Sequence, residues 1–187
     1  MGVNIRDYDY HLPPELIAQT PIEPRDSSRL LVVERASGEL AHRYFRDIGA
    51  YLRPADLLIA NQSRVIPARL LGRRLESGGA VEVLLLAARA DLGANYWETL
   101  VRPGRRLREG ARVAFGAEGS SPCLQAEVLQ RTEAGGRLVR FFSEPARDET
   151  VSTATISRLI EHAGRMPLPP YIHETLSNPE RYQTVYA

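Results

Sequence analysis

Polar and cationic side chains crowd the stretch that directly follows the apolar run 56–60. The run predicts a buried strand, and open α/β sheets bind ligands just beyond the carboxyl ends of their strands. Asn61 and Ser63 can fix the edge of a sugar or a base. Arg64 and Arg69 can fork onto a carboxylate or a phosphate. In the alternative interpretation, Asn61 caps a turn and the arginines are solvated. The residues by themselves do not decide between the two.

A second set of candidate ligand-binding residues lies near the end of the chain. Tyr171 stands in the proline-rich segment 167–172, which cannot be helical, and it is followed by Arg181, Tyr182 and Gln183. Tyrosine and arginine planes can stack on a purine, and a glutamine can hydrogen-bond to its edge. The alternative is a linker whose tyrosine packs on the protein core.

A third cationic stretch holds four arginines between residues 102 and 108, around a Pro-Gly pair that predicts a turn. A basic turn on a small β-barrel could follow a nucleic-acid backbone. The alternative is a solvated turn, and a formal net charge of +1 for the whole chain favours it.

Composition excludes several kinds of chemistry. All 24 basic residues are arginine, because the chain contains no lysine. A phosphate-loop lysine, a Schiff-base lysine and a Ser-Lys dyad are therefore excluded. The four histidines are dispersed, and Cys123 is the single cysteine, so we predict neither a metal site nor a disulfide framework. No apolar stretch is long enough to span a bilayer or to form a signal peptide, which predicts a cytoplasmic protein.

The element pattern predicts an α/β fold with an inserted small antiparallel β-barrel. Helical and strand signals alternate up to residue 60, with helices beginning near Pro13 and over 45–52. Short strand candidates separated by glycine and proline turns then follow. These candidates span residues 81–86, 96–101, 112–115, 124–129 and 138–142.

The domain boundaries follow from where the pattern of predicted helices and strands changes. An apolar stripe over 155–163 predicts a helix with Gly164 as its C-terminal cap. The closing residues 181–187 have the composition of an entering strand, so the α/β layer looks unfinished. We assign residues 1–65 to the first part of an incomplete mixed α/β domain, 66–150 to the inserted barrel, and 151–187 to the return to the α/β domain.

Several short motifs occur along the chain in a definite order. They are DYDY at 7–10 with Leu12-Pro13 and LIAQ at 16–19, Arg25-Asp26 with Ser28-Arg29-Leu30, His42 with Phe45 and Asp47, residues 61–70, GGAVE at 78–82, PLPPYI at 167–172 and RYQTVYA at 181–187. Together they resemble the S-adenosylmethionine:tRNA ribosyltransferase-isomerase family of queuosine biosynthesis. The resemblance covers essentially the whole chain, and its last two motifs are long and specific.

The resemblance implies an activity that the residues alone could not reveal. It implies transfer of the ribosyl group of S-adenosylmethionine, a co-substrate rather than a cofactor, onto 7-aminomethyl-7-deazaguanine at the wobble position of tRNA. Isomerisation then gives epoxyqueuosine, with adenine and methionine released. The general base and acid stay unassigned. The substrate-binding residues it implies are Asn61, Ser63, Arg64, Arg69, Gly78, Gly79, Glu82, Tyr171, Arg181, Tyr182 and Gln183, with Arg64 or Arg69 as the clamp on the methionine carboxylate.

The chain departs from the family pattern in two residues and in length. Gln62 stands where an acid is usual, and His173 stands where a basic residue is common. Family members are also considerably longer, so the chain resembles an amino-terminal portion that lacks a carboxyl-terminal half as its partner. The competing interpretation is a non-catalytic remnant of the enzyme that binds RNA or a nucleotide.

Overall fold

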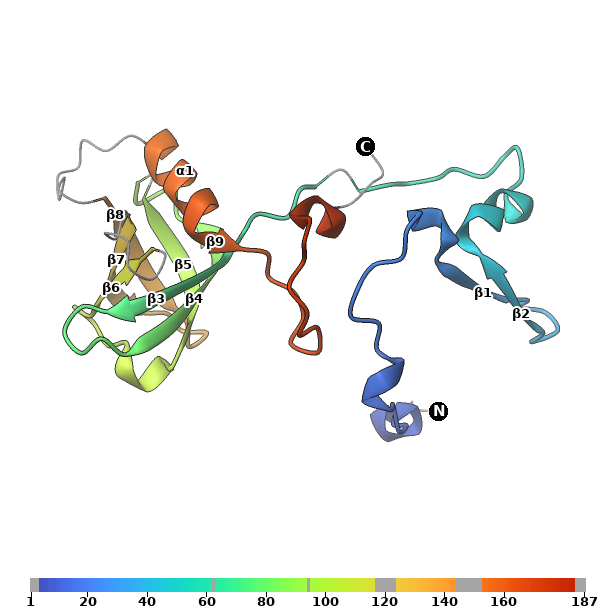
Figure 1. The fold of residues 1–187 in the computed structure, drawn as a ribbon, viewed down its shortest axis with the longest axis horizontal. Helices are drawn as coiled ribbons and strands as arrows, with labels where there is room; N and C mark the ends of the chain where they lie inside the picture. Colours follow the sequence, from blue (N-terminus) through green and yellow to red (C-terminus); the bar gives the residue numbers. More distant parts are fainter. Residues whose placement is uncertain (1–3, 62, 94, 117–123, 144–152, 184–187) are drawn as a thin grey trace. The chain divides into compact units, whose positions relative to one another are not determined.

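The computed structural model describes residues 4–61, 63–93, 95–116, 124–143 and 153–183. The chain forms two compact units, whose residues can be located in Figure 1 from its bar of residue numbers. We call Arg64–Pro167 the barrel unit, and Met1–Ser63 together with Leu168–Ala187 the flanking unit. The barrel unit is one continuous stretch of chain, whereas the flanking unit is built from the two stretches on either side of it.

Six antiparallel strands close into a barrel (Figure 1). They are β3 (Arg69–Arg74), β4 (Ala80–Ala88), β5 (Tyr96–Arg102), β6 (Arg112–Phe115), β7 (Leu124–Arg131) and β8 (Arg137–Phe142). Neighbours follow the order β3-β4-β5-β8-β7-β6, and β6 pairs back onto β3. The predicted antiparallel barrel is confirmed, and five of its strands match predicted segments. β3 has no counterpart in the prediction, because a glycine and three arginines obscure its alternation.

Strand alternation builds the barrel core. On β4, Val81, Val83 and Leu85 are buried while the residues between them are partly exposed, as a period of two requires. Phe115 of β6 and Phe141 of β8 meet inside with ring centroids 6.0 Å apart and a tilt of 43°, a favourable aromatic geometry. Each fully buried side chain of this size contributes about 1.5–3 kcal/mol, so the barrel has a substantial core of its own.

The helix α1 (Thr153–Ala163) packs with the barrel (Figure 1). Ile156 and Ile160, one helical turn apart, are buried in the same cluster as the barrel side chains, so the predicted helix is confirmed and lies in the barrel unit. This differs from its assignment to the α/β return, because burial of the apolar stripe decides where such a helix packs. The division of the chain into 1–65, 66–150 and 151–187 otherwise stays a prediction.

Gly164 has a different role from the predicted helix cap. The residue begins the two-residue strand β9 (Gly164–Arg165), which pairs with β3. A Cβ on Gly164 would collide with the backbone carbonyl oxygen of Pro67. Close approach of two backbones, rather than a left-handed cap, therefore requires glycine here.

The flanking unit is made of short elements. A hairpin joins β1 (Arg29–Val33) to β2 (Leu40–Tyr44), and Gly38 adopts φ +74° in its turn. The helices predicted near Pro13 and over 45–52 are 3₁₀ turns. The 3₁₀ segments of this unit are Ile5–Tyr8, Pro14–Leu16, Arg25–Ser27, Phe45–Tyr51 and Pro179–Tyr182, and one further segment, Gly104–Arg106, lies in the barrel unit.

The predicted buried strand at 56–60 is wrong. These residues form neither strand nor helix, and Leu57, Leu58 and Ile59 are 84%, 70% and 89% exposed. A buried strand needs hydrogen-bonding neighbours and a covering layer, and the described part of the flanking unit offers neither to this run. Arg181 and Tyr182 end a 3₁₀ helix rather than entering a strand, and residues 184–187 lie outside the described ranges.

One buried cation organises an end of the barrel. Arg137, at the start of β8, is only 9% exposed and donates to four backbone carbonyls. Its Nε donates to Leu107 O and its Nη2 to Gly104 O, both at 2.8 Å. Its Nη1 donates to the carbonyls of Gly135 and Gly136, at 3.0 and 2.8 Å. The guanidinium therefore ties the β5–β6 connection to the β7–β8 turn.

We expect Arg137→Met to lower the free energy of unfolding of the barrel by about 3 kcal/mol or more, because it leaves several carbonyls without donors. The measurement is urea unfolding followed by fluorescence of Trp97, the single tryptophan, which lies on β5. The matched control is Arg140→Met on the same strand. Arg140 lies 3.8 Å from Glu127 and is partly exposed, so its loss should cost less than about 1 kcal/mol. Equal stabilities for the two variants would contradict the role of Arg137.

Candidate functional site

The predicted site residues divide between the two units. Arg64, Arg69, Gly78, Gly79 and Glu82 belong to the barrel unit. The other six lie in the flanking unit, and they are Asn61, Ser63, Tyr171, Arg181, Tyr182 and Gln183. Gln62, where the family usually has an acid, lies outside the described residues. The residues of each unit form a set with its own local geometry.

Asn61 forms a local turn. Its Oδ1 accepts a hydrogen bond from the backbone N–H of Ser63 at 2.8 Å, which is the geometry of an Asx turn. Both residues are exposed, and so is Arg64. The turn is the one that the capping interpretation expects of Asn61, and a ligand-binding role for this stretch stays a prediction.

Arg69 and Glu82 form an ion pair on the barrel wall. Arg69 Nη2 donates to Glu82 Oε2 at 3.1 Å, and Arg69 Nε lies 2.7 Å from Oε1. Leu71 pairs with Glu82 and Arg69 with Leu84, so the two charged residues are diagonal cross-strand neighbours. Their side chains are 41% and 29% exposed. Two residues from separate motifs are thus brought together, and the Arg69 guanidinium is oriented by the Glu82 carboxylate.

Gly78 and Gly79 close the β3–β4 hairpin. Gly78 adopts φ +66°, which glycine tolerates without strain. Its N–H donates to Arg74 O, and the N–H of Arg74 donates to Gly79 O, at 2.8 and 2.9 Å. The turn follows the last residue of β3, whereas Arg69 is the first, so these glycines lie at the other end of the strand from the ion pair. Turn geometry accounts for them without a ligand.

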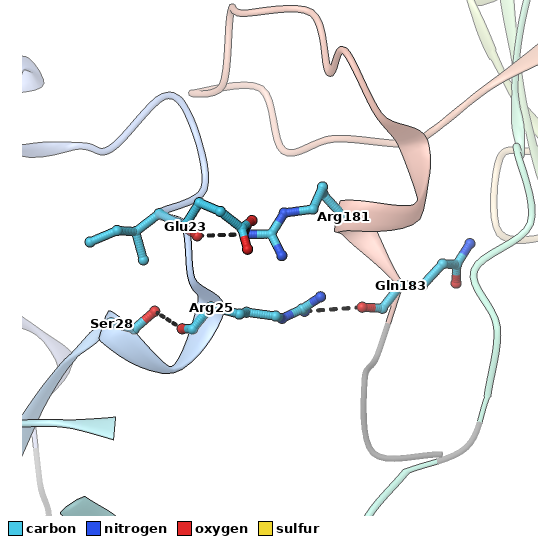
Figure 2. A network of polar contacts seen from close by, with 6 residues as sticks. Glu23, Arg25, Ser28, Arg181 and Gln183 are labelled. Carbon is cyan, nitrogen blue, oxygen red and sulfur yellow. Dashed lines mark hydrogen bonds and ion pairs between the residues drawn. The ribbon is translucent and has the colours of Figure 1, made fainter. Parts of the chain in front are cut away.

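In the flanking unit, two arginines join the two ends of the chain (Figure 2). Arg181 Nη2 donates to the carbonyl of Ile22 at 2.6 Å and lies 3.1 Å from Glu23 Oε2. Arg25 Nη2 donates to the backbone carbonyl of Gln183 at 3.0 Å. Gln183 is 6% exposed. Residues about 160 positions apart in the sequence are therefore held together by charge-assisted hydrogen bonds.

Gln19 makes a further link between the same two stretches. Its Nε2 donates to the carbonyl of Tyr171 at 2.9 Å, and its Oε1 accepts from the N–H of His173 at 2.8 Å. The side-chain amide thus pairs with the backbone on both sides of Ile172. Tyr171 itself is 53% exposed, so its ring is available for stacking. Gln19 and Arg25 belong to the motifs that resemble the family, but the sequence predicts no site role for them, because no local pattern reveals a partner so distant in the chain.

The described residues contain no group of three or more side chains suited to hold a metal ion. None of the helices found in those residues has the length and apolar character needed to cross a membrane.

What the flanking unit offers a ligand is an exposed aromatic ring on a backbone fixed by polar contacts. The barrel unit offers the oriented Arg69 guanidinium.

Comparison with known proteins gives a consistent match. The sequence model of the family described as "Queuosine biosynthesis protein" matches residues 5–187. A relative from Symbiobacterium thermophilum, named S-adenosylmethionine:tRNA ribosyltransferase-isomerase, is 52% identical over 185 residues, which are 99% of this chain and 50% of the relative. A relative of the same name from Moorella thermoacetica is 49% identical, with the same coverage. The chain spans about half the length of the curated relatives it matches.

One solved structure is similar in sequence. It is the crystal structure of an S-adenosylmethionine tRNA ribosyltransferase from Thermotoga maritima, which is 40% identical to this chain. The match covers 84% of this chain and 48% of that one, with a TM-score of 0.38.

The geometry around Gln19 gives a specific expectation. Gln19→Ala should speed exchange of the His173 amide hydrogen by about fivefold, because that N–H loses its acceptor. The measurement is hydrogen exchange followed by NMR. Gln19→Glu is the matched control, because it keeps an oxygen acceptor for His173 while removing the donor to Tyr171. Unchanged exchange in the alanine variant would show that the link does not hold this segment.

Proposed function

Because the chain belongs to the queuosine biosynthesis protein family, we propose that it forms part of an enzyme that transfers the ribosyl group of S-adenosylmethionine to tRNA. The acceptor is 7-aminomethyl-7-deazaguanine in the wobble position, and the product after isomerisation is epoxyqueuosine. The observation that carries the proposal is the family match over residues 5–187, supported by relatives of that name at 52% and 49% identity.

The chemistry sets clear demands on such a site. The sulfonium of the donor acidifies a neighbouring C–H, so a general base can start an elimination that expels adenine. The acceptor amine then adds to the ribosyl carbon skeleton, and closure of the epoxide displaces methionine. The site therefore needs a base, a proton donor for adenine and a clamp on the methionine carboxylate. The base and the proton donor stay unassigned among the residues of this chain.

Tyr171 is the residue best placed to stack on a purine. Its ring is exposed, and the backbone beside it is fixed by Gln19 on both sides of Ile172. The contacts of Arg181 and Gln183 support a positioning role for these two residues. The Arg181 guanidinium is directed at Ile22 and Glu23, and the Gln183 carbonyl accepts from Arg25. We therefore assign these two residues the positioning of the segment that carries Tyr171.

Arg69 is our candidate for the carboxylate clamp, with Glu82 as the residue that orients it. The guanidinium turns Nε and Nη2 toward Glu82, and an arginine has five N–H donors in all. Donors therefore remain for a second carboxylate. The fork geometry that suits Glu82 also suits the methionine carboxylate of the donor.

In the full-length protein, Arg69→Ala should weaken binding of S-adenosylmethionine by about 1.5–3 kcal/mol, because a charge-assisted hydrogen bond is lost. Isothermal titration calorimetry measures this. Glu82→Gln is the matched comparison: it keeps the arginine and an acceptor for it, so donor affinity should fall much less. If the two variants lose the same affinity, the pair is merely structural and Arg69 is not the clamp.

We further propose that a carboxyl-terminal portion completes the protein and covers the apolar run 57–59. Three consecutive large apolar side chains exposed at 70% or more are unusual on a finished surface. The half-length match to the curated relatives supports the same proposal. On this view the α/β layer is built from two halves, of which this chain supplies the first.

The 187 residues alone should release no adenine from S-adenosylmethionine in the presence of tRNA that carries the deazaguanine acceptor. Adding the carboxyl-terminal half of a relative as a second chain should restore release. Leu58→Asp should block this restoration, because it puts a charge into the surface to be buried. Leu40→Asp is the control and should leave restoration intact, because Leu40 lies in the β1–β2 hairpin and is 64% exposed, close to the 70% of Leu58. Full activity of the isolated chain would contradict the two-half proposal. RNA binding without adenine release by any combination would favour the non-catalytic interpretation.

A further inference from the structure

The antiparallel order of the barrel gathers three connections at one end. β3, β5 and β7 finish at this end, and β4, β6 and β8 begin there. The connections are residues 75–79, 103–111 and 132–136. The predicted arginine-rich turn is one of them, so side chains distant in sequence are brought to a common surface. We call this surface the arginine end, and its arginines are Arg74, Arg105, Arg106, Arg108, Arg131 and Arg137.

Two adjoining hollows are lined by these side chains. The first has a volume of about 490 Å³ and lies between Arg74, Glu76 and the residues of the 105–111 turn. The second, of about 480 Å³, adds Arg131 and Arg137. Arg105 and Arg108 line both. The residues that line the two hollows include six arginines and two glutamates, a formal charge of +4, whereas the whole chain carries +1. The positive charge is therefore concentrated at one end of the barrel.

Most of this charge has no carboxylate partner. The Glu76 carboxylate has two partners. Its Oε2 lies 3.7 Å from Arg74 Nε, and its Oε1 accepts a hydrogen bond from the backbone N–H of Arg112 at 3.2 Å. In the described part of the chain, no carboxylate lies within 4.0 Å of the guanidinium groups of Arg105, Arg106, Arg108 or Arg131. The Arg137 guanidinium is satisfied by four carbonyls, so its positive charge is buried without a counter-charge.

The opposite end of the barrel shows the contrast. Arg89, just after β4, makes two hydrogen bonds to Asp91, at 2.9 and 2.7 Å. The hydrogen bond from Arg89 holds the pKa of Asp91 below its usual value. That arginine is neutralised within its own turn. The arginine of this turn is therefore paired, whereas four arginines of the arginine end have no carboxylate partner in the described part of the chain.

The arginine end is also preorganised. Arg137 holds the carbonyls of Gly104 and Leu107, and so fixes the backbone on both sides of Arg105 and Arg106. Because the turn is already ordered, a ligand would not have to offset the entropy of ordering it. A cationic turn whose arginines Arg105, Arg106 and Arg108 are exposed suits anionic oxygens.

We propose that the arginine end binds a stretch of RNA sugar-phosphate backbone. Its arginines are spread over two adjoining hollows, which suits successive phosphates better than one small anion. No aromatic side chain lines either hollow, so the contacts would be to phosphates and carry no base specificity. The inference rests on the proposed function, in which a tRNA is the acceptor. It assigns binding of the tRNA backbone to the barrel.

The test measures RNA binding by the chain as a function of salt, with an unmodified tRNA transcript as the probe. Arg105→Gln/Arg108→Gln removes the two arginines shared by both hollows. It should weaken binding about tenfold or more at low salt and lower the slope of log K against log salt by about 1.5. Arg89→Gln/Arg158→Gln is the control of equal charge, since both arginines lie outside the arginine end, Arg158 is exposed and the Arg89 side chain is 38% exposed. It should change the slope little. Circular dichroism verifies that each variant is folded.

Three results would overturn the proposal. They are absence of RNA binding by the unmodified chain, equal losses in the two double variants, and complete displacement of the transcript by millimolar inorganic phosphate, which would indicate a small-anion site. Failure of the proposed function is read separately, from adenine release by the full-length protein. Suppose that the unmodified full-length protein releases adenine and that the Arg105/Arg108 variant retains both activity and RNA affinity. This result would support the proposed function and contradict RNA binding by the arginine end.

Discussion

Strand β3 is the constraint on which the barrel depends. It pairs with β4 along most of its length, with β6 at its end and with β9 at its beginning. The first two pairings close the ring, which removes exposed strand edges. The third connects the strand to the residues that follow α1. The pairing of β3 with β6 depends on close approach of the two strands at Gly72. A Cβ on Gly72 would lie 2.6 Å from Ala114 O and 2.7 Å from the Phe115 ring. A side chain at that position would push β6 away and open the barrel.

The direction of β3 also separates two kinds of surface. Its first residue, Arg69, forms an ion pair with Glu82 across the β3–β4 ladder. Its last, Arg74, borders the arginine end together with the 105–111 turn. One strand thus presents a paired arginine at its start and an anion-binding surface at its finish. The two arginines differ in how closely a glutamate holds them, since Arg69 lies 2.7 Å from Glu82 and Arg74 lies 3.7 Å from Glu76.

The flanking unit is stabilised by a different kind of interaction. Among its described residues, Gln183 alone is buried, and its apolar side chains stay partly or fully exposed. Its two stretches are joined through Gln19, Arg25 and Arg181, each of which donates to backbone carbonyls. Polar contacts of this kind fix direction and register but contribute only about 1–3 kcal/mol each. A unit held in this way gains much from any partner that covers its apolar surface.

Local sequence determined those strands and helices whose apolar residues repeat with a regular period. Alternation along 81–86, 96–101, 112–115, 124–129 and 138–142 was enough to predict five barrel strands, and the stripe over 155–163 was enough to predict α1, because burial of one face imposes a period on the chain. The motifs were enough to predict the family. The sequence did not reveal β3, whose arginines and glycine break the period, and it misassigned 57–59, because an apolar run specifies burial only where a neighbour exists to bury it.

Tertiary structure alone decided which site residues meet. Arg69 reaches Glu82 through strand register, Gln19 reaches Tyr171 across 152 positions, and Arg137 collects carbonyls from two separate turns. None of these pairings leaves a trace in local composition, because a hydrogen bond depends on distance and angle in space and not on separation along the chain. The sequence by itself determined which chemistry was available to this protein. Closure of the barrel, and the link between the two ends of the flanking unit, decided which side chains could act together.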